Sequence, residues 1–153
     1  MKIKSDAKKL SQVCHRNIVL FFGVSIEQDH FYLFSEYMSN GSVYDQIHVK
    51  KAVLKEKTII QILLSVARGM AHLHGIRTMH GALKSRNVLI SEDWEIKFSD
   101  FFGFAGVMEK YRRFKKLKKR KDAPTPYWLA PEILRGDKFG KPVDVYAFGI
   151  LIW

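Results

Sequence analysis

The stretch that decides the fold is MHGALKSRNVLI, from Met79 to Ile90. Its last three residues, VLI, are apolar and two of them are β-branched, and a second short piece with residues typical of strands, EIKF at 95–98, comes after the turn-like segment SEDW. Two short strands joined by a turn are therefore expected. Upstream, Gly75 stands where the glycine that ends a helix belongs. The stretch thus connects a helix to a pair of strands.

The strongest periodic signal in the chain lies upstream of this stretch and starts near Thr58. Apolar residues recur there at spacings of three and four along one helical face: Ile59, Leu63, Val66, Met70 and Leu73. A second row, Ile60, Leu64, Ala67 and Ala71, widens the stripe. The pattern predicts a largely buried helix. Downstream, three prolines between 124 and 131 exclude long regular structure, and DVYAFGILIW at 144–153 begins a second apolar helix.

The N-terminal part predicts one helix followed by two strands. KIKSDAKKLSQVCH at 2–15 has apolar residues three apart, which indicates a short amphipathic helix. The apolar runs IVLFFGV at 18–24 and HFYLFSEYM at 30–38 flank a polar turn and indicate adjacent strands. VYDQIHVKK at 43–51 indicates a short helix. Because the elements do not alternate strand and helix, the fold class expected is α+β.

The composition is that of a globular domain: 47% of the 153 residues are hydrophobic and 13% are aromatic. No apolar run approaches the roughly 18 residues of a membrane span, and the segment after Met1 has no hydrophobic signal core. The single cysteine, Cys14, has no partner for an internal disulfide and no companion metal ligands. These features predict a soluble cytoplasmic chain without a transmembrane segment.

The net charge of +11 is concentrated in one segment, Lys110–Lys121, where nine of twelve residues are basic and none is acidic. Without those nine charges the other 141 residues carry only +2. Two interpretations stay open: a solvated loop that binds nothing in particular, or a patch for anionic lipid or nucleic acid, with Tyr111 and Phe114 available to stack on bases.

Seven motifs in one order give the chain a resemblance to the eukaryotic protein kinase domain, and to its tyrosine kinase-like (TKL) group of serine/threonine kinases in particular. They are HRNIV at 15–19, SEYMSNGSV at 35–43, GMAHLHG at 69–75, HGALKSRNVLI at 80–90, KFSDFFG at 97–103, TPYWLAPEIL at 125–134 and DVYAFG at 144–149. The resemblance implies a partial kinase-like fold. Residues 1–38 would be the end of the N-lobe from the C helix onward, 39–153 the upper part of an incomplete C-lobe, and 104–124 a basic segment in the place of the activation loop.

The resemblance implies that the catalytic loop has lost its base. In the family motif H-R-D-L-K-x-x-N the aspartate accepts the proton of the substrate hydroxyl, and Ala82 stands at that position here. Lys84 and Asn87 match the remaining catalytic residues, whereas Gly81 replaces the arginine. General-base catalysis contributes typically about 10²- to 10⁴-fold, so the loss of the base predicts severe impairment.

The resemblance also implies sites for Mg²⁺ and ATP. Asn87 and Asp100 match the metal ligands. In the sequence DFFG at 100–103, either Phe102 replaces the glycine of the family motif or one residue is inserted, and a phenylalanine there would lack the backbone freedom of glycine that positions Asp100. For the nucleotide, Ser35 would guard the back of the pocket, backbone groups of Glu36 and Met38 would face adenine, and Leu89 would lie beneath it. No G-x-G-x-x-G occurs in the sequence, so binding of ATP and Mg²⁺ is expected to be weak or absent.

Asp144 matches the aspartate that anchors the backbone of the catalytic loop. These matches predict a catalytically impaired pseudokinase that acts on protein partners as a scaffold or regulator. Two alternatives stay open: an ATP-dependent serine/threonine kinase represented by an incomplete chain, and a module that binds an anionic polymer or membrane through residues 110–121.

Overall fold

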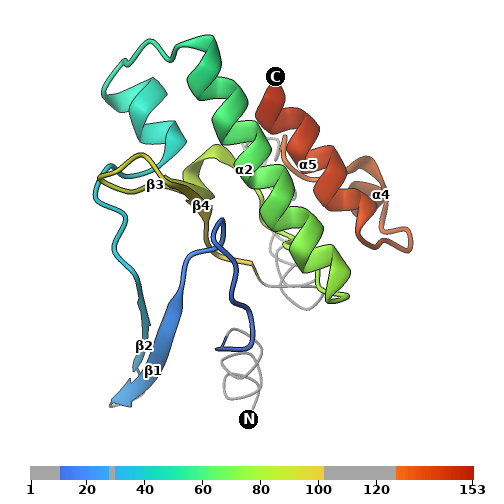
Figure 1. Cartoon of the computed structure of the whole chain (residues 1–153). Helices are drawn as coiled ribbons and strands as arrows, with labels where there is room; N and C mark the ends of the chain where they lie inside the picture. The colour runs from blue at the N-terminus through green and yellow to red at the C-terminus, as the bar shows by residue number, and fades with distance from the viewer. Residues whose placement is uncertain (1–10, 28–29, 102–126) are drawn as a thin grey trace.

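A computed structural model describes residues 11–27, 30–101 and 127–153 (Figure 1). The elements, in chain order, are β1 (Phe21–Glu27), β2 (His30–Ser35), the π-helical turn η1 (Asp45–Val49), α2 (Glu56–Gly75), the 3₁₀ turn η2 (Ser85–Asn87), β3 (Val88–Ile90), β4 (Ile96–Phe98), α4 (Pro131–Arg135) and α5 (Pro142–Ile152). In the described part, α2 runs between the β3–β4 hairpin and α5, and the β1–β2 hairpin extends away from them (Figure 1). The predicted α+β class is confirmed.

The β1–β2 hairpin confirms the two predicted strands but begins later than expected. β1 and β2 pair antiparallel, with a register shift between Phe21 and Gly23. Ile18, predicted to open the first strand, forms instead a parallel bridge to Phe98 in β4. The amide of Val19 donates to the carbonyl of Phe98 at 3.0 Å, and the amide of Phe98 donates to Asn17 at 3.1 Å. Residues 17–19 therefore join the second sheet and are not available to extend β1.

Helix α2 confirms the predicted element, but its buried face is only partly the predicted one. The residues of α2 that are buried are Ile62, Ser65, Val66, Gly69, Met70 and Leu73. Ile59, Ile60 and Leu64 were predicted to lie on the buried stripe and are exposed at 44%, 48% and 49%. The reason lies at Gly69, where a Cβ atom would stand 2.5 Å from Cε1 of Phe98. The face of α2 that carries Gly69 therefore packs against the ring of Phe98. Ile59, Ile60 and Leu64 lie away from this contact and are exposed to solvent.

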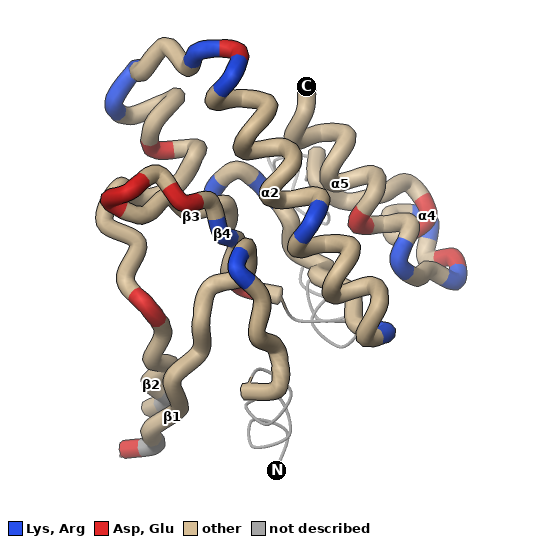
Figure 2. Tube along the Cα trace, in the orientation of Figure 1, with Lys and Arg blue, Asp and Glu red and all other residues tan. Residues whose placement is uncertain are grey.

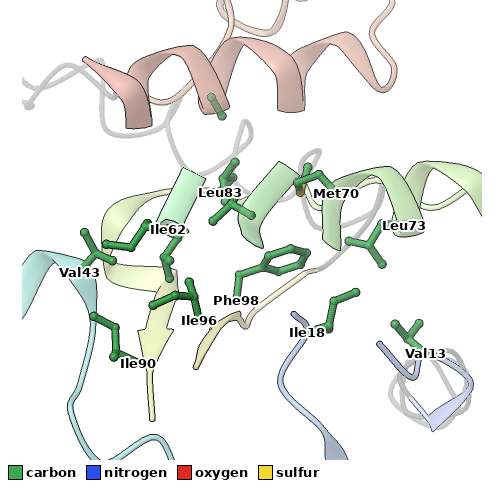
Figure 3. Close-up of a cluster of buried hydrophobic side chains, with 13 residues drawn as sticks. Val13, Ile18, Val43, Ile62, Met70, Leu73, Leu83, Ile90, Ile96 and Phe98 are labelled. Carbon is green, nitrogen blue, oxygen red and sulfur yellow. The ribbon is translucent and has the colours of Figure 1, made fainter. Parts of the chain in front are cut away.

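The main core lies between α2, the β3–β4 hairpin and the loop before β3, with Phe98 at its centre (Figure 3). Phe98, Leu73, Val88 and Ile90 are fully buried. A second cluster joins Met79, at the start of the stretch 79–90, to Ala130 just before α4, to Ile133 in α4 and to Val143 in α5. The two clusters hold the loop 79–87 from both sides.

The hairpin at 88–98, the short helix within 43–51 and the C-terminal helix are confirmed. β3 and β4 pair antiparallel, with Val88 opposite Phe98 and Ile90 opposite Ile96. η1 occupies the predicted short helix at 43–51, and α5 begins at Pro142, two residues before the predicted start. Most of the predicted helix at 2–15 lies outside the described residues, and its described end, residues 13–15, is not helical. All of the basic segment at 104–124 lies outside the described residues. The division into two lobes stays a prediction.

The turn at 15–17 makes the stability of the fold depend on pH. The ring of His15 stacks on His72 of α2 at 4.9 Å between centroids, and its Nδ1 accepts a hydrogen bond from the amide of Asn17 at 3.1 Å. Burial lowers the pKa of His15 below its ordinary value of 6.5, and the neighbouring His72 and Arg16 lower it further. The unfolded chain therefore binds this proton at a higher pH than the folded chain does. The stability present above pH 6.5 is lost as the pH falls below this value.

We expect His15→Asn to flatten this part of the pH profile, because Oδ1 of asparagine takes the place of Nδ1 as acceptor and does not titrate. Urea unfolding at pH 7.5, 6.5 and 5.5 measures the effect. Wild-type stability should fall over this range more than that of the variant. Equal slopes for the two proteins would contradict the assignment to His15.

Candidate functional site

The loop that precedes β3 is anchored by one buried carboxylate. Asp144, in the first turn of α5, is 1% exposed. Its Oδ2 accepts a hydrogen bond from the amide of His80 at 2.8 Å and lies 2.9 Å from Nε2 of His74, at the end of α2. Its Oδ1 accepts from the amide of Gly81 at 2.8 Å. Three segments of the chain thus meet at this carboxylate, and its bonds to the two amides confirm the predicted anchor of the loop.

Gly81 and His80 set the path of the loop after this anchor. Gly81 has φ of 71°, in the left-handed region that glycine adopts without a steric penalty. The ring of His80 is fully buried and lies 4.9 Å from the ring of Phe98, while its Nδ1 accepts from the amide of Ala82 at 3.1 Å. This ring contact packs the loop against β4.

The predicted catalytic residues sit on this anchored loop. Asn87 is buried, and its Nδ2 donates to the carbonyl of Ala82 at 2.9 Å, which closes the loop on itself. This bond holds the main chain of residue 82 in place. The side chain of Ala82 is a methyl group, so residue 82 carries no acid–base group. Lys84 is half-buried and makes no ion pair with a residue of the described ranges.

Asn87 and Asp100, the predicted metal ligands, lie at the same end of the β3–β4 hairpin. The ladder pairs Val88 with Phe98, and beyond it the amide of Ser99 donates to the carbonyl of Asn87 at 2.9 Å. Asp100 follows directly, exposed, with φ of 61°. Its carboxylate makes no ion pair with the described residues, and Oδ1 of Asn87 accepts no hydrogen bond among them.

Two free oxygen ligands at one edge fit Mg²⁺, which is bound through one or two protein side chains together with phosphates and water. Within the described ranges, no cluster of three or more His, Cys, Asp or Glu residues could hold a metal by itself. The effect of Phe102 on Asp100 is untested, because Phe102 lies outside the described residues.

The predicted adenine-facing residues follow β2, and the chain after them crosses to β3. Ser35 ends β2. Among the described residues, nothing accepts a hydrogen bond from the amide of Met38, although the carbonyl of Met38 accepts from Gly41 at 3.1 Å. Ser42 then bridges to Leu89. Leu89 is half-buried between the buried Val88 and Ile90, so its side chain faces away from the main core. The fold therefore brings Met38 and Leu89 into one region.

One pair in this region was missed by sequence reasoning. Oε2 of Glu36 lies 2.6 Å from Nζ of Lys97 in β4, with both side chains largely buried. Oε1 of Glu36 accepts from the amide of Leu20 at 2.6 Å. Only the backbone of Glu36 was expected to matter, because nothing in the sequence links residues 36 and 97. Elsewhere in the described part, basic and acidic residues are interspersed along the chain (Figure 2).

Comparison with known proteins decides the family. The model of the protein tyrosine and serine/threonine kinase family matches residues 1–153. The chain belongs to the protein kinase family. The kinase relatives include a protein of Acanthamoeba polyphaga mimivirus named as a serine/threonine-protein kinase/receptor, 33% identical over 99% of this chain and 9% of the relative. A serine/threonine-protein kinase of Arabidopsis thaliana is 31% identical over 94% of this chain and 24% of its own length.

The kinase chain thus spans less than a quarter of the length of these curated relatives. Family membership confirms the predicted kinase-like fold and supports the serine/threonine kinase ancestry. Among the helices in the described ranges, none is long and apolar enough to cross a bilayer.

Proposed function

We propose that this kinase domain is a pseudokinase of the TKL group that acts in the cytoplasm as a scaffold or regulator of protein partners. The observation that supports this proposal is Ala82. The loop around it keeps its anchor, since Asp144 holds His80 and Gly81, and Asn87 holds the carbonyl of Ala82. A methyl group at the base position of an ordered loop leaves the shape intact and removes the proton acceptor.

The same proposal includes a weak half-site for Mg²⁺ and ATP. Asn87 and Asp100 would hold the metal, and the Glu36 carbonyl, the Met38 amide and Leu89 would meet the base, with Ser35 behind it. When bound, Mg²⁺ neutralises phosphate charge. Within the 153 residues, which contain no G-x-G-x-x-G, the groups that this half-site offers are those that meet the base and those that hold the metal.

The proposal predicts binding without turnover. Millimolar ATP with Mg²⁺ should raise the midpoint of thermal unfolding by about 2–4 °C, because a ligand that binds only the folded state stabilises it by mass action. Asp100→Ala should abolish the Mg²⁺-dependent part of the shift. Asp93→Ala, which removes an exposed carboxylate in the turn between β3 and β4, is the matched control and should behave as wild type.

A phosphotransfer assay with labelled ATP separates this function from the alternative, an active serine/threonine kinase represented by part of its chain. The names of the relatives favour the alternative, and Ala82 speaks against it. Under our proposal, wild type and Asp100→Ala transfer no label to serine or threonine peptides. Transfer by wild type that disappears in Asp100→Ala would reject the pseudokinase. The absence of any thermal shift would reject the nucleotide half-site.

The third function, binding of an anionic lipid or nucleic acid through Lys110–Lys121, rests on the sequence alone, since the segment lies outside the described residues. This function predicts that the affinity of the chain for an anionic lipid or nucleic acid falls steeply as the salt concentration rises.

A further inference from the structure

The amide of Leu20 donates to the side-chain carboxylate of Glu36. In a regular antiparallel sheet this amide would donate to the main-chain carbonyl of Glu36. The amide of Glu36 donates to the carbonyl of Leu20 at 3.0 Å, which continues the pairing of β1 with β2. In a hydrogen-bonded antiparallel pair the two residues exchange both main-chain bonds. Here the return bond is replaced, because the amide of Leu20 donates to Oε1 of Glu36 at 2.6 Å.

This replacement leaves the carbonyl of Glu36 open. Among the described residues its one donor is the hydroxyl of Ser35 at 3.5 Å, a distance too long for a strong bond. Two residues further on, the amide of Met38 has no acceptor in the described part either. An open acceptor and an open donor thus stand two residues apart in the segment that follows β2.

Lys97 fixes the carboxylate in this arrangement. Its Nζ lies 2.6 Å from Oε2 of Glu36, and the side chains of Lys97 and Glu36 are 14% and 22% exposed. The second carboxylate near Lys97, Glu95, is 3.9 Å away and 58% exposed, so it competes weakly. The pair also joins the two sheets, since Glu36 follows β2 and Lys97 lies in β4 opposite Leu89. Burial and the short distance make this orientation of the carboxylate the stable one.

We propose that Glu36, through its carboxylate and with Lys97, is a positioning residue for purine recognition. By taking the amide of Leu20, the carboxylate keeps the carbonyl of Glu36 available as an acceptor next to the amide donor of Met38. Such a pair fits a base edge that presents an N–H group beside an acceptor nitrogen, as the amino edge of adenine does. Guanine presents a carbonyl oxygen in place of the amino group and fits poorly. This inference rests on the nucleotide half-site proposed above.

Four variants test the assignment, with adenosine as the ligand and NMR titration as the measurement. In Glu36→Ala the amide of Leu20 is free to pair with the main-chain carbonyl of residue 36. A ligand must then break this hydrogen bond before it can use the carbonyl. One such hydrogen bond corresponds to an affinity for adenosine that is about three- to tenfold weaker. Glu36→Gln keeps an acceptor oxygen and should restore most of the affinity. Lys97→Met should give a smaller loss than Glu36→Ala, and Glu95→Ala should bind as wild type.

The amide signal of Leu20 provides a second readout, which a general loss of stability would not produce. It should move in Glu36→Ala and stay near its wild-type position in Glu36→Gln. Wild-type affinity in Glu36→Ala would overturn the inference and leave the half-site standing. Failure of the wild-type chain to bind adenosine would overturn both, and the two results are distinguishable in the first titration.

Discussion

Replacing Asp144 by alanine should lower the free energy of unfolding by about 3–5 kcal/mol, because one buried and one partly buried amide lose their acceptor at about 1–3 kcal/mol each and His74 loses its partner. The amides belong to His80 and Gly81, and both bonds measure 2.8 Å. The carboxylate is 1% exposed, so its bonds are shielded from bulk solvent. Urea unfolding followed by circular dichroism measures the change.

Two further variants distinguish the loss of the hydrogen-bond acceptor at residue 144 from the loss of a negative charge. Asp144→Asn keeps one acceptor oxygen and places an amide donor against a main-chain N–H, so its loss should be smaller than that of alanine but still above 1 kcal/mol. Asp137→Ala removes a carboxylate that pairs with Arg135 at 2.7 Å on the exposed surface. Exposed pairs contribute about 0–1 kcal/mol, so this control should be nearly neutral. A loss for Asp144→Ala as small as that of Asp137→Ala would show that the loop does not depend on this anchor.

The anchored loop is the part of the site that the sequence predicted well. Each contact there joins residues whose types have few alternatives, such as a buried carboxylate that must find donors. The resemblance to kinases therefore placed Ala82 and Asn87 on one loop and Asp144 as the anchor of that loop, and the structure has this arrangement. Their predicted roles with metal and nucleotide stay predictions. The same sequence did not reveal the Glu36 carboxylate. Its two partners are Leu20, which precedes β1, and Lys97, which lies in β4. They come together because Ile18, just before Leu20, pairs with Phe98 of β4, and no sequence pattern predicts this bridge.

The fold was predicted best where a pattern admits one answer, as in the short strands VLI and IKF. Helix α2 shows why a correct element can have an incorrect face. Its apolar residues form two adjacent rows, and a period of 3.6 residues does not decide which row is buried. The deciding residue is Gly69, which periodicity treats as neutral. Its lack of a side chain allows Phe98 to approach the helix, and this contact leaves Ile60 and Leu64 exposed.

Adding one methyl group at Gly69 should therefore destabilise the protein, although alanine is the better helix former. The new Cβ would lie 2.5 Å from Cε1 of Phe98 and 3.1 Å from the carbonyl oxygen of Asn17, which is main chain and pinned by its bond from Phe98. Overpacking of this kind costs about 1–3 kcal/mol, and more where the neighbour is fixed. The gain of up to about 1 kcal/mol in helix propensity offsets only part of this loss. We expect Gly69→Ala to lower the free energy of unfolding by about 2 kcal/mol in urea titration.

Gly75, in the same helix, supplies the matched control, because a Cβ there meets nothing within 4 Å. Gly75→Ala should leave the stability unchanged or raise it by up to about 1 kcal/mol, so one chemical change has opposite signs at two positions of α2. Trimming the ring with Phe98→Leu in the Gly69→Ala background completes a double-mutant cycle, and the two substitutions should compensate by at least about 0.5 kcal/mol. Additive effects would mean that Phe98 and Gly69 do not share this contact. The choice of which face of α2 is buried would then need another cause.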